Sequence, residues 1–103
     1  MTPRRWQIWR IWFAYDEDPT RGKYRPVVIK DVTGDGCVVV YVTSRVHGHA
    51  PDLIPIRNWA EAGLPKASAI RYRRQLRIRI DQLGDYVGDL SPYDRIELQM
   101  KYL

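Results

Sequence analysis

The pattern of apolar positions predicts mainly β structure over the first half of the chain. The segment Trp6–Tyr15 is largely apolar on both alternating faces, which is typical of a central strand covered on both sides. Tyr24–Asp31 and Cys37–Thr43 are rich in β-branched residues and are predicted to be two further strands. Val32–Gly36 contains the residues of a tight hairpin turn, and Asp16–Lys23 contains turn residues and is expected to be a loop. Together these segments predict an antiparallel meander.

The second half of the chain contains the longest alternating pattern. In Ile70–Ile80 the even positions are apolar and the odd positions are Arg or Gln, and Arg74 is the exception. This alternation predicts a half-buried strand with an arginine-lined outer face. Before it we expect a loop over Ser44–Asp52, a short strand over Leu53–Ile56 and a helical turn over Arg57–Gly63.

The C-terminal segment is predicted to be a helix. Ser91 is placed as the N-cap, Pro92 at the first helical position, and Asp94 at the third, where a carboxylate meets free backbone N–H groups. One apolar stripe is expected to dock this helix on the sheet, namely Tyr93, Ile96, Met100 and Leu103. Residues 1–103 are thus expected to form a single mainly β domain, a small curved antiparallel barrel with one C-terminal helix.

Charge and composition narrow the classes of function. Seventeen Lys and Arg against twelve Asp and Glu give a net charge of +5, which favours polyanionic partners and also keeps a small protein soluble. Cys37 is the only cysteine, which excludes an internal disulfide framework and a cysteine-based zinc site. No apolar run approaches the roughly 20 residues of a membrane span, so we expect a soluble cytoplasmic protein that does not bind membranes.

Four segments of the chain resemble motifs of the MazF/PemK-type toxins of prokaryotic toxin–antitoxin pairs. They occur in the order known for that family and extend over nearly the whole chain. The segments are DPTRGKYRPVVI (Asp18–Ile29), VVVYVTSR (Val38–Arg45), AGLPKASAI (Ala62–Ile70) and VGDLSPYD (Val87–Asp94).

The resemblance implies a barrel of SH3-like topology, usually a homodimer, that cleaves single-stranded RNA such as mRNA at short sequences. It implies no metal or other cofactor, inhibition by a cognate antitoxin that folds onto the toxin, and contact with DNA only through that antitoxin. The catalytic positions of the family correspond to Arg25 and Thr43, and a one-residue shift in the pairing would exchange Thr43 for Ser44.

The chain also departs from the family pattern. Trp6–Gln7–Ile8 stands where many members have Gly-Asp, and the loop between the first two strands is short. Some members carry an acidic residue on the strand that corresponds to Ile70–Ile80, whereas the matching residue here is Arg73 or Arg74. These differences bear on RNA affinity, on sequence choice and on acid or base assistance from that strand.

The candidate residues suit cleavage by attack of a ribose 2′-OH on its own phosphate. The Arg25 guanidinium can stabilise the extra negative charge of the phosphorane, and it is a poor general base because its pKa is above about 12. The Thr43 hydroxyl can hydrogen-bond a phosphate oxygen or position the 2′-OH. His47 has a suitable unperturbed pKa of about 6.5, but its place in a loop does not show that it reaches the phosphate.

Other basic and aromatic residues have both a functional and a structural interpretation. The arginine face can be solvated and paired with nearby aspartates, or its like charges can contact an RNA backbone or an acidic antitoxin segment. His47 and His49 lack further ligands for a metal site and are interpreted as solvated residues. The tryptophans near the N-terminus are interpreted mainly as core or dimer interface, with base stacking by one exposed Trp as the lesser alternative. The candidate RNA-binding residues are Arg21, Lys23, Arg71, Arg73 and Arg77.

Three functions of different classes remain open from the sequence. The first is a metal-independent endoribonuclease toxin, as the resemblance implies. The second is a non-catalytic nucleic-acid-binding barrel, and the third is an interaction module that accepts an acidic peptide.

Overall fold

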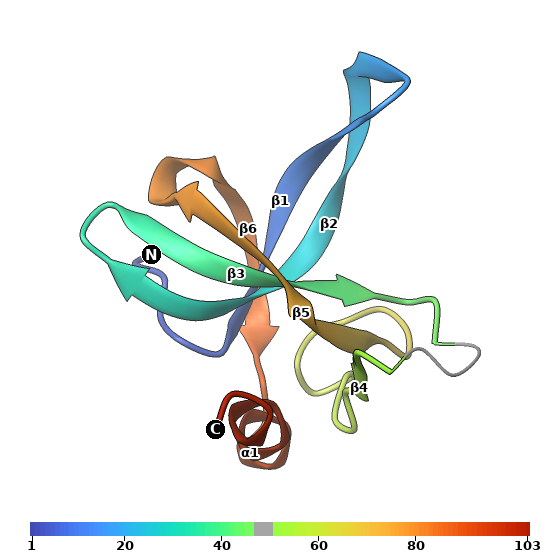
Figure 1. Cartoon of the computed structure of the whole chain (residues 1–103), viewed down its shortest axis with the longest axis vertical. Coiled ribbons are helices and arrows are strands. Elements are labelled where there is room, and N and C mark those ends of the chain that lie inside the picture. The colour runs from blue at the N-terminus through green and yellow to red at the C-terminus, as the bar shows by residue number, and fades with distance from the viewer. Residues whose placement is uncertain (47–50) are drawn as a thin grey trace.

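The computed structural model describes residues 1–46 and 51–103 and contains one strongly curved antiparallel sheet and one C-terminal helix (Figure 1). The strands follow one another across the sheet in the order β4-β5-β3-β2-β1-β6. Their bounds are β1 (Gln7–Tyr15), β2 (Asp18–Thr33), β3 (Gly36–Thr43), β4 (Leu53–Pro55), β5 (Ala69–Arg79) and β6 (Leu83–Asp89). The helix α1 spans Pro92–Met100. This architecture confirms the predicted mainly β fold with a C-terminal helix.

The first three strands form the predicted meander, but the hairpin between β1 and β2 is longer than expected. The expected loop over Asp16–Lys23 is wrong, because β2 already begins at Asp18 and runs on without a break. Pairing continues to the end of β1, where Ala14 lies opposite Gly22 and, after a register shift, Tyr15 lies opposite Asp18. Gly22 permits this close approach, since a Cβ there would lie within van der Waals overlap of the Phe13 carbonyl oxygen. The far end of this hairpin projects beyond the rest of the sheet (Figure 1).

Coverage of β1 on both sides is confirmed only for its first half. Ile8, Trp9 and Ile11 are buried, whereas Trp12 is 49% exposed. The second half of the strand lies in the projecting hairpin, and its residues are exposed or half-buried. The shorter turn between β2 and β3 is as expected, with Gly34 at a φ of 60°.

Strand β5 contains a bulge, and the side chains after the bulge point to the opposite face from the one that the sequence alternation predicts. Arg71 pairs with Tyr41, and the next pair joins Gln75 to Val40, the preceding residue on β3. Neighbouring residues of a strand point to opposite faces, so Arg71 and Gln75 lie on opposite faces of the sheet. The expected continuous arginine face over Ile70–Ile80 is therefore wrong. The apolar positions Ile70, Tyr72 and Ile78 are buried as predicted, but the first two contact one core cluster and the last contacts the other.

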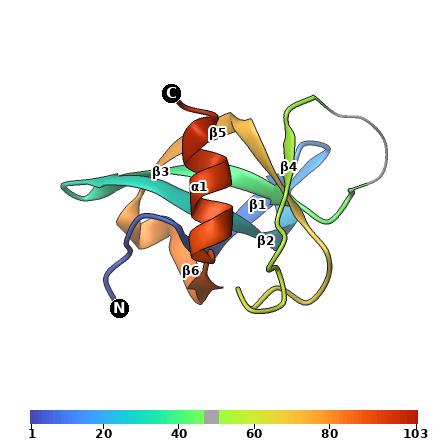
Figure 2. The same ribbon diagram turned by 90° about the horizontal axis from the view of Figure 1, so that it is seen from below.

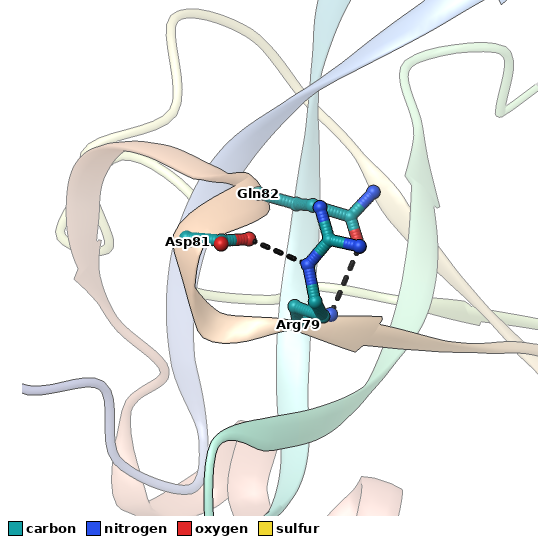
Figure 3. Close-up of polar contacts among 3 residues, drawn as sticks. All are labelled: Arg79, Asp81 and Gln82. Carbon is teal, nitrogen blue, oxygen red and sulfur yellow. Dashed lines mark hydrogen bonds and ion pairs between the residues drawn. The ribbon is translucent and has the colours of Figure 1, made fainter.

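Strand β6 was not recognised from the sequence. Its segment contains glycine and aspartate and has no clear alternation, yet it pairs along β1, with Tyr86 opposite Trp9. A short 3₁₀ turn joins it to β5, where Arg79 Nε donates to Asp81 at 3.0 Å and Arg79 N–H donates to the Gln82 side chain at 2.9 Å (Figure 3). Among the described residues this is the one ion pair.

Two apolar clusters stabilise the sheet from its two faces. One lies between the sheet, the segment after β4 and α1, and it includes Ile8, Val28, Val40 and Leu98. The other lies on the opposite face and includes Val27, Ile29, Val39 and Cys37. Burial raises the pKa of the Cys37 thiol, in keeping with a core residue.

Helix α1 lies across one face of the sheet, but with a different side inward from the one expected (Figure 2). The inward residues are Asp94, which is 2% exposed, and Leu98, which is fully buried. The Asp94 carboxylate accepts from Arg57 N–H at 2.9 Å and Asn58 N–H at 3.0 Å. These bonds join the start of the helix to the predicted helical turn, in which Ala62 N–H donates to Asn58 O at 3.1 Å.

The orientation of α1 leaves its apolar stripe in solvent. The N-cap prediction is confirmed, because the Ser91 hydroxyl accepts from Asp94 N–H. The predicted docking stripe is wrong, since its members are between 46% and 103% exposed. These residues are Tyr93, Ile96, Met100 and Leu103. In the described part of the chain no helix is long and apolar enough to cross a membrane.

Candidate functional site

A cleft of about 460 Å³ opens where β2 and β3 separate. Pairing between these strands ends at Val27 and Tyr41, and beyond this point β2 pairs only with β1. One wall comes from the β1–β2 hairpin, another from the end of β3 and the residues that follow it, and a third from the segment before β5. The cleft is therefore a consequence of strand divergence in the curved sheet.

Arg25 and Thr43 lie on the same face of the sheet and both line this cleft. Val27 and Tyr41 are opposite each other, so they share a face. Arg25 is two residues from Val27, and Thr43 is two residues from Tyr41, which returns both side chains to that face. The two residues that the family resemblance nominated are thus brought together by the register of β2 and β3.

The Thr43 hydroxyl is held by the chain that follows it. Its Oγ1 accepts from Arg45 N–H at 3.1 Å, which uses a lone pair and not the hydroxyl hydrogen. That hydrogen can therefore be donated to an anionic group in the cleft. Ser44 also lines the cleft and is exposed, whereas Thr43 is half-buried.

The cleft is strongly cationic. No Asp or Glu is among its described lining residues, and none of its cations forms an ion pair within residues 1–46 and 51–103. A concave site lined by unpaired cations attracts phosphate groups, and Arg can contact two phosphate oxygens at once. The six cationic residues of the lining are Arg10, Lys23, Arg25, Arg45, Lys66 and Arg71.

The predicted RNA-binding residues divide into two groups in the structure. Lys23 and Arg71 line the cleft. Arg21 is exposed on β2 within the projecting hairpin and does not line it, and Arg73 lies exposed in the β5 bulge. Arg77 pairs with Val38, on the face of the sheet opposite Arg71.

Three cationic residues of the cleft were missed at the level of sequence. Arg10 is the one charged residue in the mainly apolar strand β1, and this interruption was the signal that could have indicated it. Arg45 follows directly after the motif that nominated Thr43. Lys66 precedes β5 in a segment without regular structure, where the Ser68 hydroxyl donates to its carbonyl at 2.9 Å.

Aromatic side chains also contribute to the lining of the cleft. The Phe13 and Tyr41 rings have centroids 5.1 Å apart and both line the cleft, as does Tyr24. Phe13 packs against the core cluster on the face that carries Arg25. The cleft thus combines positive charge with flat apolar surface, a combination that suits single-stranded nucleic acid.

A metal centre finds no support in the described part of the chain. Residues 1–46 and 51–103 contain no group of three or more His, Cys, Asp or Glu arranged to hold a metal ion. His47 and His49 lie outside the described residues, so their interpretation as solvated residues stays a prediction.

Comparison with protein families gives a match over nearly the whole chain. Residues 4–101 match the model of the family described as PemK-like, MazF-like toxin of type II toxin–antitoxin system. The chain belongs to this toxin family. The resemblance to this family that four sequence segments indicated is thereby confirmed. Among curated proteins, no sequence matches the chain.

Solved structures of the same fold come from mycobacteria. An endoribonuclease in complex with its cognate antitoxin from a mycobacterial species superposes with a TM-score of 0.73 at 18% identity, covering 95% of this chain and 88% of the other. A second mycobacterial endoribonuclease gives 0.67 at 19% identity over 94% and 84% of the two chains. The Mycobacterium tuberculosis toxin MazF-mt6 gives 0.66 at 22% identity over 89% of each. At these identities the likeness establishes a shared fold, which confirms the expected barrel topology.

Proposed function

We propose that the protein is an endoribonuclease toxin that cleaves single-stranded RNA, with mRNA as its target, at preferred sequences and without a metal ion. Family membership and the endoribonuclease neighbours support the activity. The observation that carries the proposal is the position of Arg25 and Thr43 on one face of a cationic cleft. The remaining cations of the cleft would hold the flanking phosphates.

In this proposal the reaction is an internal transesterification. The 2′-oxygen forms a bond to the adjacent phosphorus, the bond from phosphorus to the 5′-oxygen breaks, and the proton lost by the 2′-OH is matched by one gained at the 5′-oxygen. The products are a 2′,3′-cyclic phosphate and a free 5′-hydroxyl. Arg25 stabilises the charge that develops on the phosphorane oxygens, and Thr43 donates a hydrogen bond that orients the phosphate or the 2′-OH.

The test is cleavage of a single-stranded RNA in the presence of EDTA. The wild type is expected to cut the RNA, and Arg25→Ala is expected to lower the rate by about 100-fold or more, because it removes the charge stabilisation at the phosphorane. Arg21→Ala is the matched control, since Arg21 is also an exposed arginine of β2 but does not line the cleft. Equal rates for the wild type and Arg25→Ala would contradict the assignment.

A second function, non-catalytic binding of nucleic acid, is favoured by one feature of the cleft. Neither a carboxylate nor a histidine is among its described lining residues, so none of them is a conventional general base. This alternative is supported if the protein binds RNA with salt-dependent affinity and leaves it intact after long incubation.

The proposal extends to the protein's partners. We infer inhibition by a cognate antitoxin, because one neighbour of the same fold was solved with its cognate antitoxin. We also infer a cytoplasmic homodimer, and the apolar stripe left exposed on α1 supports the dimer, since a second copy would cover it. Sedimentation of the wild type and of Ile96→Glu tests this: a dimer that Ile96→Glu dissociates is expected, and a monomeric wild type would contradict it.

A further inference from the structure

Two large aromatic side chains of the β1–β2 hairpin, one of which lines the cleft, are exposed without belonging to either core. Trp12 on β1 is 49% exposed and Tyr24 on β2 is 58% exposed. Neither packs within the two apolar clusters of the sheet. Exposed apolar surface of this size next to a polar site is typical of a ligand contact.

The two rings form a defined pair. Trp12 and Tyr24 lie directly opposite each other in the β1–β2 register, and their ring centroids are 5.1 Å apart at an angle of 68°. The Tyr24 ring lies beside β6 at Gly84, where a Cβ would approach it to 3.2 Å. The backbone thus supports one side of the pair, while the exposed fractions leave the rest of both rings open. A perpendicular pair also leaves a ring face uncovered by its partner.

The pair adjoins the cleft through Tyr24, on the face of the hairpin opposite that of Arg25 and Thr43. Tyr24 lines the cleft and directly precedes Arg25, and Arg10, which shares a face of β1 with Trp12, lines it as well. The other aromatic pair, Phe13 and Tyr41, is half-buried, and Phe13 packs against one of the two core clusters. Core packing therefore accounts for the position of Phe13, whereas neither core cluster includes Trp12 or Tyr24.

The charge around the pair indicates its occupant. A polyanion whose phosphates occupy a site of unpaired cations brings its bases within a few ångströms of those cations, and unpaired bases stack on aromatic rings whatever their identity. We propose that Trp12 and Tyr24 form a stacking platform for one unpaired base of a single-stranded RNA bound in the cleft. This platform rests on the proposed RNA function and adds to it a subsite for a nucleotide that flanks the cleavage site, because Tyr24 and Trp12 lie on the face of the hairpin opposite Arg25.

The experiment measures binding of a short 2′-O-methyl RNA, in which the attacking hydroxyl is blocked. Trp12→Ala is expected to weaken binding by about 5- to 150-fold, the range for loss of one stacked base. Trp12→Phe is expected to retain most of the affinity and Trp12→Leu to lose it, because leucine preserves apolar packing but has no π face. The dependence of affinity on salt is expected to stay unchanged in all three, because Trp12 carries no charge.

Two matched controls separate stacking from a structural effect. Tyr86→Ala removes an exposed aromatic residue from β6, 37% exposed and outside the cleft lining, and is expected to leave binding unchanged. In the second control, oligonucleotides that each lack the base at one position are compared with the intact RNA. At one position, loss of the base is expected to weaken binding by the wild type. The same loss is expected to leave binding by Trp12→Ala unchanged, because that variant has already lost the stacking contact.

The outcomes that overturn the platform differ from those that overturn the proposed function. If the wild type binds and cleaves RNA while Trp12→Ala binds within twofold of it, the platform is wrong and the function stands. The platform is also wrong if Trp12→Leu binds as well as Trp12→Phe, or if the loss of affinity in Trp12→Ala follows a change in oligomeric state or unfolding. If the wild type neither binds nor cleaves RNA, both proposals are wrong.

Discussion

Arg71 and Arg77 provide the sharpest test of how the β5 bulge arranges the basic surface. Both are arginines of one strand, and the alternation in the sequence places them on one face. The bulge separates them, so that Arg71 lines the cleft and Arg77 lies on the opposite face. We predict that Arg71→Ala weakens binding of a 2′-O-methyl RNA and that Arg77→Ala does not.

The size of the effect follows from the number of cations in the cleft. Each phosphate neutralised on a single strand contributes about −0.7 to the slope of log affinity against log salt concentration. If all six cations of the cleft contact phosphates, the slope is about −4. Between about 50 and about 200 mM salt, that slope corresponds to a loss of about 300-fold in affinity. Arg71→Ala is expected to reduce the slope by about 0.7 and the affinity by about tenfold, the lower end for a charge-assisted hydrogen bond.

The assay is a salt titration of RNA affinity for the wild type and both variants. Arg77→Ala is expected to stay within twofold of the wild type with an unchanged slope. Equal losses in both variants would refute the division of the arginines by the bulge, because a continuous arginine face would then contact the RNA.

Two further predictions concern the helix and its surroundings. Asp94→Ala leaves two backbone N–H groups without their carboxylate acceptor, so we expect the free energy of unfolding in urea to fall by about 3 kcal/mol, and a fall below about 1 kcal/mol would count against this anchor. Burial of the phenol and, to a lesser extent, its interaction with the neighbouring Tyr72 raise the pKa of Tyr102 to about 12. The neutral phenol is thus favoured in the folded state, so its contribution to stability is complete below about pH 10 and is lost as the pH rises toward 12. Ultraviolet titration is expected to show a tyrosine that ionises near pH 12 and that is missing in Tyr102→Phe; an unchanged titration in that variant would show the assignment to be wrong.

The sequence correctly predicted those features that depend only on residues close together in the chain. The turn at Gly34 and the N-cap at Ser91 are examples, because backbone conformation and a side-chain hydrogen bond determine them within a few residues. The core positions of β2 and β3 also followed from their β-branched residues. The motifs then placed Arg25 and Thr43, and the strand register brings them to one face.

The remaining features depend on contacts that are distant in sequence. Strand β6 exists because β1 offers it a partner, and its own residues gave no strand pattern. The turned-over β5 depends on a bulge against β3, which alternation alone does not reveal. Backbone N–H groups of Arg57 and Asn58 bind the Asp94 carboxylate and so turn that side of α1 toward the sheet. The apolar stripe on the other side of the helix therefore faces solvent.

The central claim is that Arg25 and Thr43 act on the same scissile phosphate, and a double-mutant cycle tests it most directly. Single-turnover cleavage would be measured for the wild type, Arg25→Ala, Thr43→Val and the double variant. If both side chains serve one phosphate, the double variant is expected to be about as slow as the slower single variant, with strongly non-additive free energies of activation. Additive effects would contradict the claim, because they would mean that the two residues act independently.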